Sequence, residues 1–488
     1  MGKVWAFDLG ASNGRLMLGS FNGEKINLEE IHRFPNSPVH INTHYYWDIL
    51  RIFQEMKNGI TKSVKMGHKD VMSMGVDTWG VDFGLLSPTG ELIGNPYSYR
   101  DEHFQDGMEE MLEEISKSEL FSRTGVEPAP INTICQLYTI QKKKPDLLKG
   151  AISLLFTPNL ISYFFSGVKK NEFTITSTSQ LYSYKQKKWD TEMLDKLNIP
   201  VDILGDITPS GTILGPTLEE INKELQIDPV QVINIAGHDT ACALAALPIN
   251  KKNTAFMSCG TWVLVGIQVE QPVVSEDALA WGFTNEGTLE GHYRLQKNNM
   301  GLWLIQQCHK VWEREGHGIS YEEQNLLVNE AKPLQHFINP DDQTFFNPKN
   351  MVTAIQDYCI NSGQTPPETK GEILRCILES LAFKYQWVLE KLENLTNTSL
   401  EEIHMGGGGI QNHLLCQFIA NATDRTVHAG PIEASAIGNA LSQWIALGEI
   451  KDIQEARQIV QRSFVTKTYY PQNQINFSEA YNRFLKLI

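Results

Sequence analysis

Basic residues are scarce relative to acidic ones in this sequence. Its 42 Lys and Arg residues stand against 57 Asp and Glu residues, which gives a formal net charge of −15 at pH 7. A phosphate backbone would be repelled by this surplus of negative charge rather than steered toward the protein. The composition therefore argues against a nucleic-acid partner, and any anionic ligand has to be held locally.

Cysteine pairs and long apolar runs are also missing. The seven cysteines are scattered without a CxxC pair, which is typical of reduced thiols in a cytosol. A disulfide between Cys359 and Cys376 is the weaker alternative. No signal-peptide pattern precedes the first expected strand. The longest apolar run, AISLLFTPNLISYFF, is too short to span a bilayer and is expected to form a pair of buried helices. Together these features predict a cytoplasmic protein.

Several catalytic signatures are absent as well. The sequence contains no GxxxxGK[ST], no GxGxxG after a strand and no HExxH. Its thirteen histidines show no metal-ligand spacing. A DFG triplet lies within GVDFG, but the strand Lys and the HRD motif of a protein kinase do not precede it.

The first distinctive feature is a Gly-rich loop between two strands. In VWAFDLGASNGRLMLGSF (4–21) the loop GASNG leads into a second strand rather than a helix, and Asn22-Gly23 predicts a hairpin turn before a third strand at 26–34. Gly10, Ser12 and Gly14 leave room for backbone N–H groups to wrap a phosphate. Asp8 at the loop mouth suits a phosphate-bound Mg²⁺. The alternative is that GASNG is only a tight hairpin.

A second copy of this device favours the phosphate interpretation. TAFMSCGTWVLVGIQV (254–269) is again strand, small turn and strand, about half a chain later. We therefore predict a duplicated β-meander and two domains, 1–247 and 248–488, joined by a hinge near 247–253 and facing each other across a cleft. Strands are expected on both sides of Trp79-Gly80, and helices in DGMEEMLEEISKSELFSRTG and KGEILRCILESLAFKYQWVLEKLENL.

Consecutive glycines mark a third candidate site. GGGGIQN (406–412) lies between a predicted strand and helix, where missing side chains would let a flat ring lie against the backbone. AGPIEASAIGNA follows as a loop leading into a helix of small residues. We interpret the two stretches as walls of an adenosine slot. The alternative for the glycines is a flexible turn.

The best candidate for a catalytic acid or base is Asp239, in IAGHDTACALAAL (235–247). It is either a helix N-cap, a general base, or both. A helix N-terminus would keep this carboxylate ionised and weakly basic, which phosphoryl transfer tolerates because its loose transition state mainly needs positioning and charge neutralisation. DTWGVDF (77–83) and YRDEH (99–103) combine aromatic rings, carboxylates and an exposed glycine, a mixture that suits a polyol or sugar.

Taken in order, DLGASNGR (8–15), WGVDF (79–83), HDT (238–240), SCGTW (258–262) and GGGIQN (407–412) resemble the FGGY carbohydrate kinases nearly end to end. DLGAS, WGVDF and NNMGLWLIQQ (298–307) point to the branch of that family that acts on L-rhamnulose. The resemblance implies an α/β fold of the ribonuclease H-like type shared by actin and hexokinase, with duplicated mixed-sheet domains around a central cleft. It also implies ATP and Mg²⁺ as cofactors.

By the same resemblance, Asp239 is the base in transfer of the γ-phosphate to the 1-hydroxyl of L-rhamnulose. The residues that it assigns to ATP are Ala11, Ser12, Asn13, Gly14, Arg15, Thr261, Asn298, Gln306, Gly407 and Gly408, with Asp8 at the metal. The residues that it assigns to the sugar are Gly80, His238, Asp239 and Thr240, and more weakly Tyr99, Asp101 and Asn132. Gly406 stands where an apolar residue would be more typical, which leaves open which glycine touches the base.

Without the resemblance, the residues predict a two-lobed ATP-dependent phosphotransferase for a small polyhydroxylated substrate, either a monomer or a homodimer. A kinase of a neighbouring ketose, such as L-fuculose or xylulose, is the nearest alternative, because a sugar methyl group contributes only a few kcal/mol of discrimination. A non-catalytic ATP-dependent assembly protein with the same fold is a more distant one, since the sequence shows no added partner domain.

Overall fold

The computed structural model describes residues 2–472 and 474–488, which fold into two compact units. Unit 1 consists of Met1–Asn250, Gln268–Leu295 and Glu433–Phe464, and unit 2 of Lys251–Ile267, Gln296–Ile432 and Val465–Ile488. The chain first passes from unit 1 to unit 2 between Asn250 and Lys251, within the predicted hinge at 247–253. A single boundary at residue 247 nevertheless does not describe the packing, because two later segments return to unit 1.

Unit 1 is built on a mixed six-stranded sheet of order β13-β14-β6-β1-β2-β3. The strands β1 (Gly2–Leu9), β2 (Asn13–Phe21) and β3 (Ile26–Pro35) form the predicted antiparallel meander. β6 (Val71–Thr78) is parallel to β1 and to β14 (Gln231–Asn234), and β13 (Thr212–Pro216) closes the edge antiparallel to β14.

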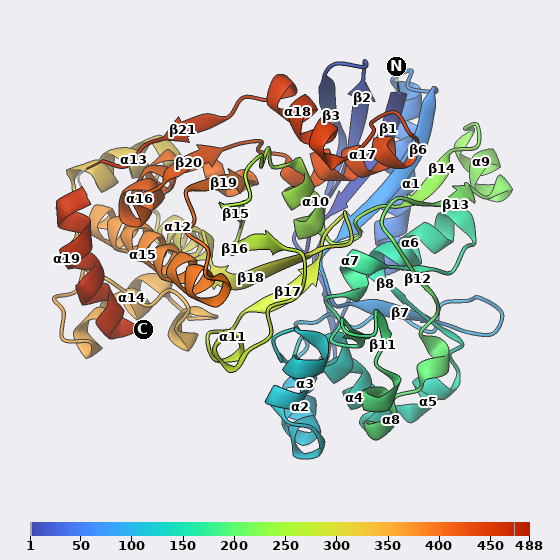
Figure 1. The fold of residues 1–488 in the computed structure, drawn as a ribbon, viewed down its shortest axis with the longest axis horizontal. Coiled ribbons are helices and arrows are strands. Elements are labelled where there is room, and N and C mark those ends of the chain that lie inside the picture. Colours follow the sequence, from blue (N-terminus) through green and yellow to red (C-terminus); the bar gives the residue numbers. More distant parts are fainter. Residues whose placement is uncertain (1, 473) are drawn as a thin grey trace. The chain divides into compact units, whose positions relative to one another are not determined.

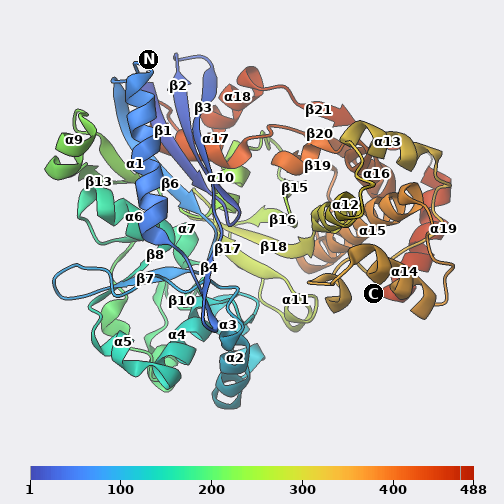
Figure 2. The same ribbon diagram turned by 180° about the vertical axis from the view of Figure 1, so that it is seen from behind.

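Alternation along β1 divides the core of unit 1 between the two faces of this sheet. Trp5, Phe7 and Leu9 join a cluster with α1 (Ile49–Lys65) and α6 (Thr157–Ser166) (Figure 2). Val4 and Ala6 pack instead with α17 (Ala434–Ala446), which lies beside α10 (Asp239–Ala246) (Figure 1). Asp8, two residues after Ala6, therefore points to the α17 face.

The remaining elements of unit 1 surround the sheet or form its peripheral layers. They are β4 (Val39–Ile41), β5 (His44–Tyr46), β7 (Phe83–Leu86), α2 (His103–Glu114), α3 (Lys117–Thr124), α4 (Thr133–Lys143), α5 (Pro145–Lys149), β8 (Ser153–Phe156), β9 (Asn171–Glu172), α7 (Phe173–Thr176), β10 (Tyr182–Ser183), β11 (Lys188–Trp189), α8 (Thr191–Lys196), η1 (Val201–Ile203), β12 (Ile207–Thr208), α9 (Glu219–Leu225), α11 (Glu276–Ala280), β17 (Thr284–Gly287) and α18 (Ile453–Ser463).

The expected helix pair at AISLLFTPNLISYFF is wrong. Its first part is the strand β8, which pairs with β7, and the helix α6 begins only at Thr157. Pro158 occupies the first turn of that helix, where its missing N–H costs nothing. The strands predicted around Trp79-Gly80 are confirmed as β6 and β7, which belong to different sheets.

Unit 2 repeats the strand pattern of unit 1. β15 (Thr254–Cys259) is antiparallel to β16 (Trp262–Val269) and parallel to β19 (Glu402–Gly406). β20 (Thr426–Ala429) continues the sheet in parallel and β21 (Lys467–Tyr469) closes it antiparallel. The strand order β16-β15-β19-β20-β21 therefore has the same succession of antiparallel, parallel, parallel and antiparallel pairs as β2-β1-β6-β14-β13 in unit 1. The predicted duplication is confirmed.

The strand β18 (Tyr293–Met300) passes from unit 1 into unit 2. The predicted long helix is confirmed as α15 (Lys370–Thr396), which begins with a capping box at Thr369 and Glu372 and packs against α16 (His413–Thr423). The other elements of unit 2 are α12 (Trp303–Arg314), α13 (Tyr321–Glu330), η2 (Gln343–Phe345), α14 (Met351–Asn361), η3 (Gly408–Gln411), α19 (Gln474–Phe484) and η4 (Leu485–Leu487). No helix among the described residues is both long and apolar enough to cross a membrane.

All seven cysteines are buried free thiols, as the absence of CxxC pairs predicted. The disulfide alternative at Cys359 and Cys376 is therefore not formed. A hydrogen bond between these two thiols lowers the pKa of Cys359, while the same bond and burial raise the pKa of Cys376.

Candidate functional site

Three carboxylates gather at the ends of neighbouring strands of unit 1. Asp8 and Asp77 are partners in the parallel β1–β6 register. Gly237, two residues before Asp239, accepts a hydrogen bond from Thr78 N at 2.9 Å, so Asp239 follows the strand next to β6. The carboxyl ends of parallel strands are where α/β proteins place their ligands. The fold thus joins two predicted site residues, Asp8 and Asp239, to one that the sequence did not single out, Asp77.

Asp77 carries the signature of a cation site. It is fully buried, Asn439 donates to its Oδ2 at 2.7 Å, and its Oδ1 has no hydrogen-bond partner among the described residues. Burial and the neighbouring Asp8 carboxylate raise its pKa well above the ordinary value. A divalent cation would relieve this repulsion, and clustered carboxylate oxygens are ligands that Mg²⁺ prefers. The residues at this point therefore fit Mg²⁺.

Asp239 differs from the expected cap. It is the first residue of α10, and His238 takes the cap position. Its Oδ1 accepts a hydrogen bond from the Thr240 hydroxyl at 3.0 Å. The helix terminus favours a weakly basic carboxylate, whereas desolvation of this half-buried group raises the pKa of Asp239. A raised pKa makes this carboxylate a better proton acceptor near neutral pH.

The predicted first phosphate loop is a three-residue connection between β1 and β2. Gly10 N donates to Asn13 O at 2.9 Å, and Asn36 fixes the loop from outside by donating to Gly10 O at 2.8 Å. Ser12 is exposed, whereas Ala11 and Asn13 are half-buried. Gly14 serves packing, because a Cβ atom there would lie 2.3 Å from the Phe34 ring. The open part of the loop is therefore residues 10–13.

Arg15, predicted to contact ATP, is held by two acids in this structure. Its guanidinium donates to Asp8 Oδ2 at 2.5 Å and to Glu433. The two carboxylates raise the arginine's pKa further despite its burial. Arg15 therefore offsets the negative charge at the mouth of the loop.

The Gly80 turn borders His238. A Cβ atom at Gly80 would lie 3.5 Å from His238 Nε2 and 3.3 Å from Thr178 Oγ1. The next residue, Val81, has a φ of 68°, which is rare for a β-branched residue. Its N–H donates to Thr178 Oγ1 and its carbonyl accepts from Thr133 Oγ1 at 2.7 Å. Backbone strain held in this way is typical of functional sites.

A buried carboxylate that the sequence did not single out organises the aromatic side of this turn. Asp82 Oδ2 accepts from Trp47 Nε1 at 2.5 Å, from Trp79 Nε1 at 2.9 Å and from Tyr99 N at 3.2 Å. Its Oδ1 accepts from Gln136 Nε2 at 2.9 Å. Burial nevertheless raises the pKa of Asp82 to about 6.

The two indoles and the predicted sugar residue Tyr99 are therefore fixed by one anion. The ring centroids of Trp47 and Trp79 lie 4.1 Å apart. Burial raises the pKa of Tyr99, and the charges of Asp82 and Asp239 add to the effect. The Tyr99 hydroxyl thus lies within electrostatic range of the candidate base.

The two other sugar candidates are engaged elsewhere. Asn132 is buried and donates to Glu127 O at 2.8 Å and to Gln180 Oε1 at 3.2 Å. It precedes Thr133, which contacts the Val81 carbonyl, so it lies near the Gly80 turn. Asp101 accepts backbone N–H donors on both oxygens, from Tyr45 and from His103. Direct contact of Asp101 with a sugar is therefore less suited to this geometry than the sequence implied.

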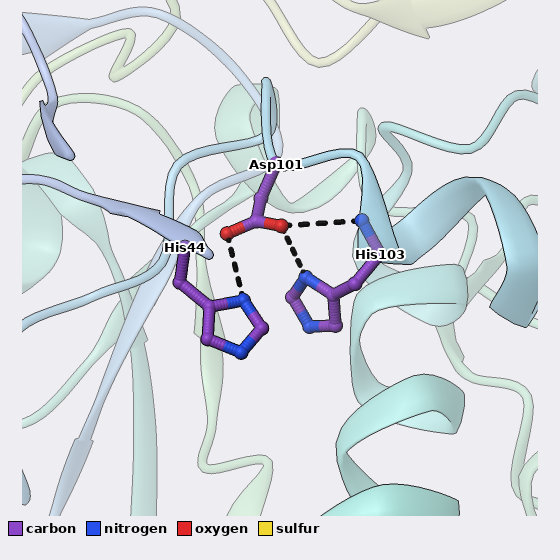
Figure 3. Close-up of side chains that lie close together, drawn as sticks. All are labelled: His44, Asp101 and His103. Carbon is purple, nitrogen blue, oxygen red and sulfur yellow. Dashed lines mark hydrogen bonds and ion pairs between the residues drawn. The ribbon is translucent and has the colours of Figure 1, made fainter. Parts of the chain in front are cut away.

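Asp101 also brings together two histidines that sequence spacing did not connect (Figure 3). His44 Nδ1 lies 3.1 Å from Asp101 Oδ2, and His103 Nδ1 lies 2.6 Å from Oδ1. The three groups are close enough to hold a metal ion. However, Lys144 Nζ lies 3.1 Å from His44 Nε2. Because an ammonium can only donate, His44 Nε2 accepts from Lys144, and the protonated His44 Nδ1 donates to Asp101. The three residues therefore satisfy one another as a hydrogen-bonded cluster.

Unit 2 carries the second phosphate loop and the glycine loop. Thr261 O accepts from Trp303 N at 3.3 Å, so the turn after β15 packs on the start of α12. Asn298 on β18 and Gln306 on α12 are both exposed, as nucleotide contacts would need to be.

The glycines of the glycine loop are not equivalent. A Cβ atom at Gly407, whose φ is 92°, would lie 2.6 Å from Cys259 O, and one at Gly409 would lie 2.9 Å from Cys259 Cβ. A Cβ atom at Gly408 would have no described atom within 4 Å. Gly406 ends β19 as a partner of Ser258. Gly408 is therefore the glycine with a free face, and Gly407 and Gly409 are needed for packing.

The small residues of AGPIEASAIGNA have a different role from the expected one. A Cβ atom at Gly438 would lie 1.8 Å from Cys242 O, so they let α17 approach α10 within unit 1. Asn439 of the same helix donates to Asp77. Helix α17 as a wall of the adenosine slot stays a prediction. The preceding loop is better placed, because Pro431 O accepts from Gly407 N at 3.3 Å.

The sequence interpretation missed Asp82, Glu286, Arg294 and Asn439. Arg294 lies in β18 (YRLQKNNM), where most residues are polar, so no hydropathy pattern marked it as a buried charge. Asp82 and Asn439 lie in DTWGVDF and AGPIEASAIGNA, two stretches that the sequence patterns assigned to the site without singling out these residues. Nothing in the sequence pointed to Glu286.

Comparison with known proteins places both halves in one family. Residues 4–246 match the N-terminal domain and residues 255–447 the C-terminal domain of the FGGY family of carbohydrate kinases. A protein named rhamnulokinase from Bacteroides thetaiotaomicron is 40% identical over 99% of this chain and 98% of its own. One from Halalkalibacterium halodurans is 39% identical over 95% and 98%, respectively.

Solved structures share the fold at low identity. Ligand-bound xylulose kinase from Lactobacillus acidophilus has a TM-score of 0.84 at 16% identity, covering 100% of this chain and 98% of its own. Plasmodium falciparum glycerol kinase with ADP has a TM-score of 0.81 at 14% identity, with the same coverage.

Proposed function

Because the chain belongs to the FGGY family of carbohydrate kinases, we propose that it transfers the γ-phosphate of ATP to the 1-hydroxyl of L-rhamnulose, a step of L-rhamnose catabolism. The observation that carries the chemistry is the convergence of Asp8, Asp77 and Asp239 beside the loop at residues 10–13. The sugar is proposed from the rhamnulokinases, which are similar over nearly the whole chain.

In this proposal the oxygen of the sugar 1-hydroxyl bonds to the γ-phosphorus of ATP, and the bond between that phosphorus and the oxygen of the departing ADP breaks. Asp239 accepts the proton of the 1-hydroxyl. Its raised pKa suits this role, and Thr240 orients the carboxylate through the bond to Oδ1. The loose transition state mainly requires that the reactants be aligned. His238 and the Gly80 turn would hold the sugar, and Tyr99 would border it.

Several backbone groups are candidates for nucleotide contacts. Backbone N–H groups of residues 11–13 and of the turn at Thr261 would hold phosphates, and the free face of Gly408 would receive the adenine. Bound Mg²⁺ would neutralise phosphate charge, and Asp8 and Asp77 are the residues that would hold it. The compartment that we propose is the cytoplasm.

A coupled assay of ADP release over L-rhamnulose, L-fuculose and L-xylulose tests the substrate. We expect the highest kcat/KM for L-rhamnulose. A higher value for another ketose would replace the proposed sugar and leave the kinase class intact.

Asp239→Asn tests the base. The variant should lose activity by orders of magnitude and still bind ATP. Asp277→Asn, which removes an exposed acid from the first turn of α11, is the matched control and should remain active. Near-normal turnover of Asp239→Asn would remove Asp239 from the catalytic role.

A further inference from the structure

An ion pair on β17 and β18 contacts the ring of His238. Arg294 is fully buried, and its Nη2 lies 2.5 Å from both Glu286 Oε2 and His238 Nδ1. Its Nη1 donates to the carbonyl of Gly287. On the other side of the ring, His238 Nε2 lies 3.5 Å from Asp239 Oδ1. One imidazole thus connects a buried arginine to the proposed base.

The chemistry of the guanidinium determines where the imidazole proton lies. Arginine has only donors and stays charged in proteins. Two N–H groups cannot point at each other across 2.5 Å, so His238 Nδ1 has to be the acceptor. Glu286 Oε2, at 3.3 Å from Nδ1, is the more distant neighbour of that nitrogen. The imidazole is therefore neutral, with its proton on Nε2, toward Asp239 and the Gly80 turn.

Glu286 remains ionised beside Arg294. Burial would raise its pKa, but the charge of Arg294 and the hydrogen bond from that arginine lower it. The charge of the buried arginine is thereby offset without a proton from the imidazole. The pair adds no net charge next to the ring.

The framework around His238 is rigid on both sides. Gly287 N donates to Ser177 Oγ at 2.7 Å, and a Cβ atom at Gly287 would lie 2.5 Å from the Phe173 ring, so β17 is pressed onto α7. The His238 backbone N–H donates to Thr174 Oγ1 at 3.2 Å, and Thr174 donates to the buried Glu172 at 2.7 Å. The backbone and the ring of His238 are thus held by separate contacts.

We propose that Arg294 and Glu286 are positioning residues that fix His238 in the Nε2–H tautomer, which makes it a hydrogen-bond donor to an oxygen of the acceptor sugar. The role toward the sugar rests on the proposed function, whereas the tautomer does not. A neutral donor orients the substrate without placing a cation beside Asp239, where it would lower the basicity of the carboxylate.

The tautomer can be read directly in the unaltered full-length protein without substrate. Long-range ¹H–¹⁵N spectra of ¹⁵N-histidine-labelled protein distinguish protonated from bare ring nitrogens, and His238→Gln assigns the signals. We expect a bare Nδ1 and a protonated Nε2 at neutral pH. A protonated Nδ1 overturns the proposal, whether or not any sugar is phosphorylated.

Kinetic variants test the role of the pair. Arg294→Lys keeps a charged donor beside His238 and should therefore keep KM for L-rhamnulose close to that of the unaltered protein. The double variant Glu286→Leu/Arg294→Met removes both charges, a replacement that buried pairs often tolerate. The double variant should raise KM for L-rhamnulose about tenfold or more, as loss of one oriented hydrogen bond does, and leave KM for ATP unchanged.

An ion pair in unit 2, with Glu379 buried and Arg375 half-buried, controls for general destabilisation. Arg375 Nε donates to Glu379 Oε1 at 2.7 Å within α15. Glu379→Leu/Arg375→Met should leave KM for the sugar unchanged. Unchanged sugar KM in the Glu286/Arg294 double variant, or an equal rise in the control, overturns the positioning role. Absence of activity on every ketose in the unaltered protein, with the expected tautomer, would instead refute the proposed substrate.

Discussion

Asp82 offers a quantitative test of how the sugar side of the site is held. The perturbation is Asp82→Asn, which keeps the shape of the side chain and removes its titration. Burial raises the pKa of this fully buried carboxyl from 3.8 to about 6. A shift of about two units corresponds to about 3 kcal/mol between the protonation states.

The sign follows from the raised value. The folded protein holds the Asp82 proton more tightly than the unfolded chain does. The resulting stability is fully present below the unfolded pKa near 4 and is lost as the pH rises through about 6. Between pH 7 and pH 5 this group should therefore add about 1.3 kcal/mol to the free energy of unfolding.

Urea unfolding of the unaltered protein and of Asp82→Asn at pH 5 and pH 7 isolates this contribution, because the two proteins have the same titratable groups except for Asp82. The stability of the unaltered protein minus that of the variant should be about 1.3 kcal/mol larger at pH 5. An equal difference at both pH values would refute the argument.

A second measurement is independent of unfolding. The indole N–H signals of Trp47 and Trp79, which both donate to Asp82, should shift together with a midpoint near pH 6. Indole signals that stay constant between pH 5 and pH 7.5 would show that Asp82 does not titrate there. The variant should also bind the sugar more weakly, because all four hydrogen-bond partners of Asp82 are donors and an amide would turn an NH₂ group against at least one of them.

Three further outcomes follow from the same geometry. Gly408→Ala should fold normally and raise KM for ATP, whereas Gly407→Ala should lower the free energy of unfolding by about 1–3 kcal/mol because the positive φ of Gly407 and the Cys259 carbonyl exclude a Cβ atom. Thermal unfolding and ATP kinetics distinguish these two effects. The reverse result would exclude Gly408 from the adenine site. Asp8→Asn should raise the Mg²⁺ concentration needed for half-maximal activity, and an unchanged Mg²⁺ titration would remove Asp8 from the metal. The buried thiols should not react with Ellman's reagent until the protein is unfolded; rapid reaction of the native protein would contradict their burial.

Local patterns were sufficient wherever the physics is local. Period-two alternation, Asn22-Gly23 and the Gly-containing turns predicted the two meanders, and the helical spacing after Lys370 predicted α15. The same logic failed at AISLLFTPNLISYFF, because a short apolar run does not distinguish a buried strand from a buried helix.

Electrostatics could not be predicted from chain position. The helix terminus suggested a weakly basic Asp239, but the pKa of a carboxyl group depends on how much protein surrounds it. Asp101 illustrates the same limit, since its partners His44 and Tyr45 come from a strand more than fifty residues earlier. Neither burial nor partner identity is encoded by spacing.

The sequence by itself determined the kind of protein: a duplicated α/β kinase with two Gly-containing turns between strands and an acid at the start of a helix, because each of these is a short stretch with its own backbone requirement. Only the tertiary structure decided what surrounds that acid. It brought Asp77 beside Asp8, Asn439 beside Asp77, and Arg294 with Glu286 against His238. The physical reason is that hydrogen bonds and charges act over a few ångströms in space, and the residues that meet there lie up to several hundred positions apart in the chain.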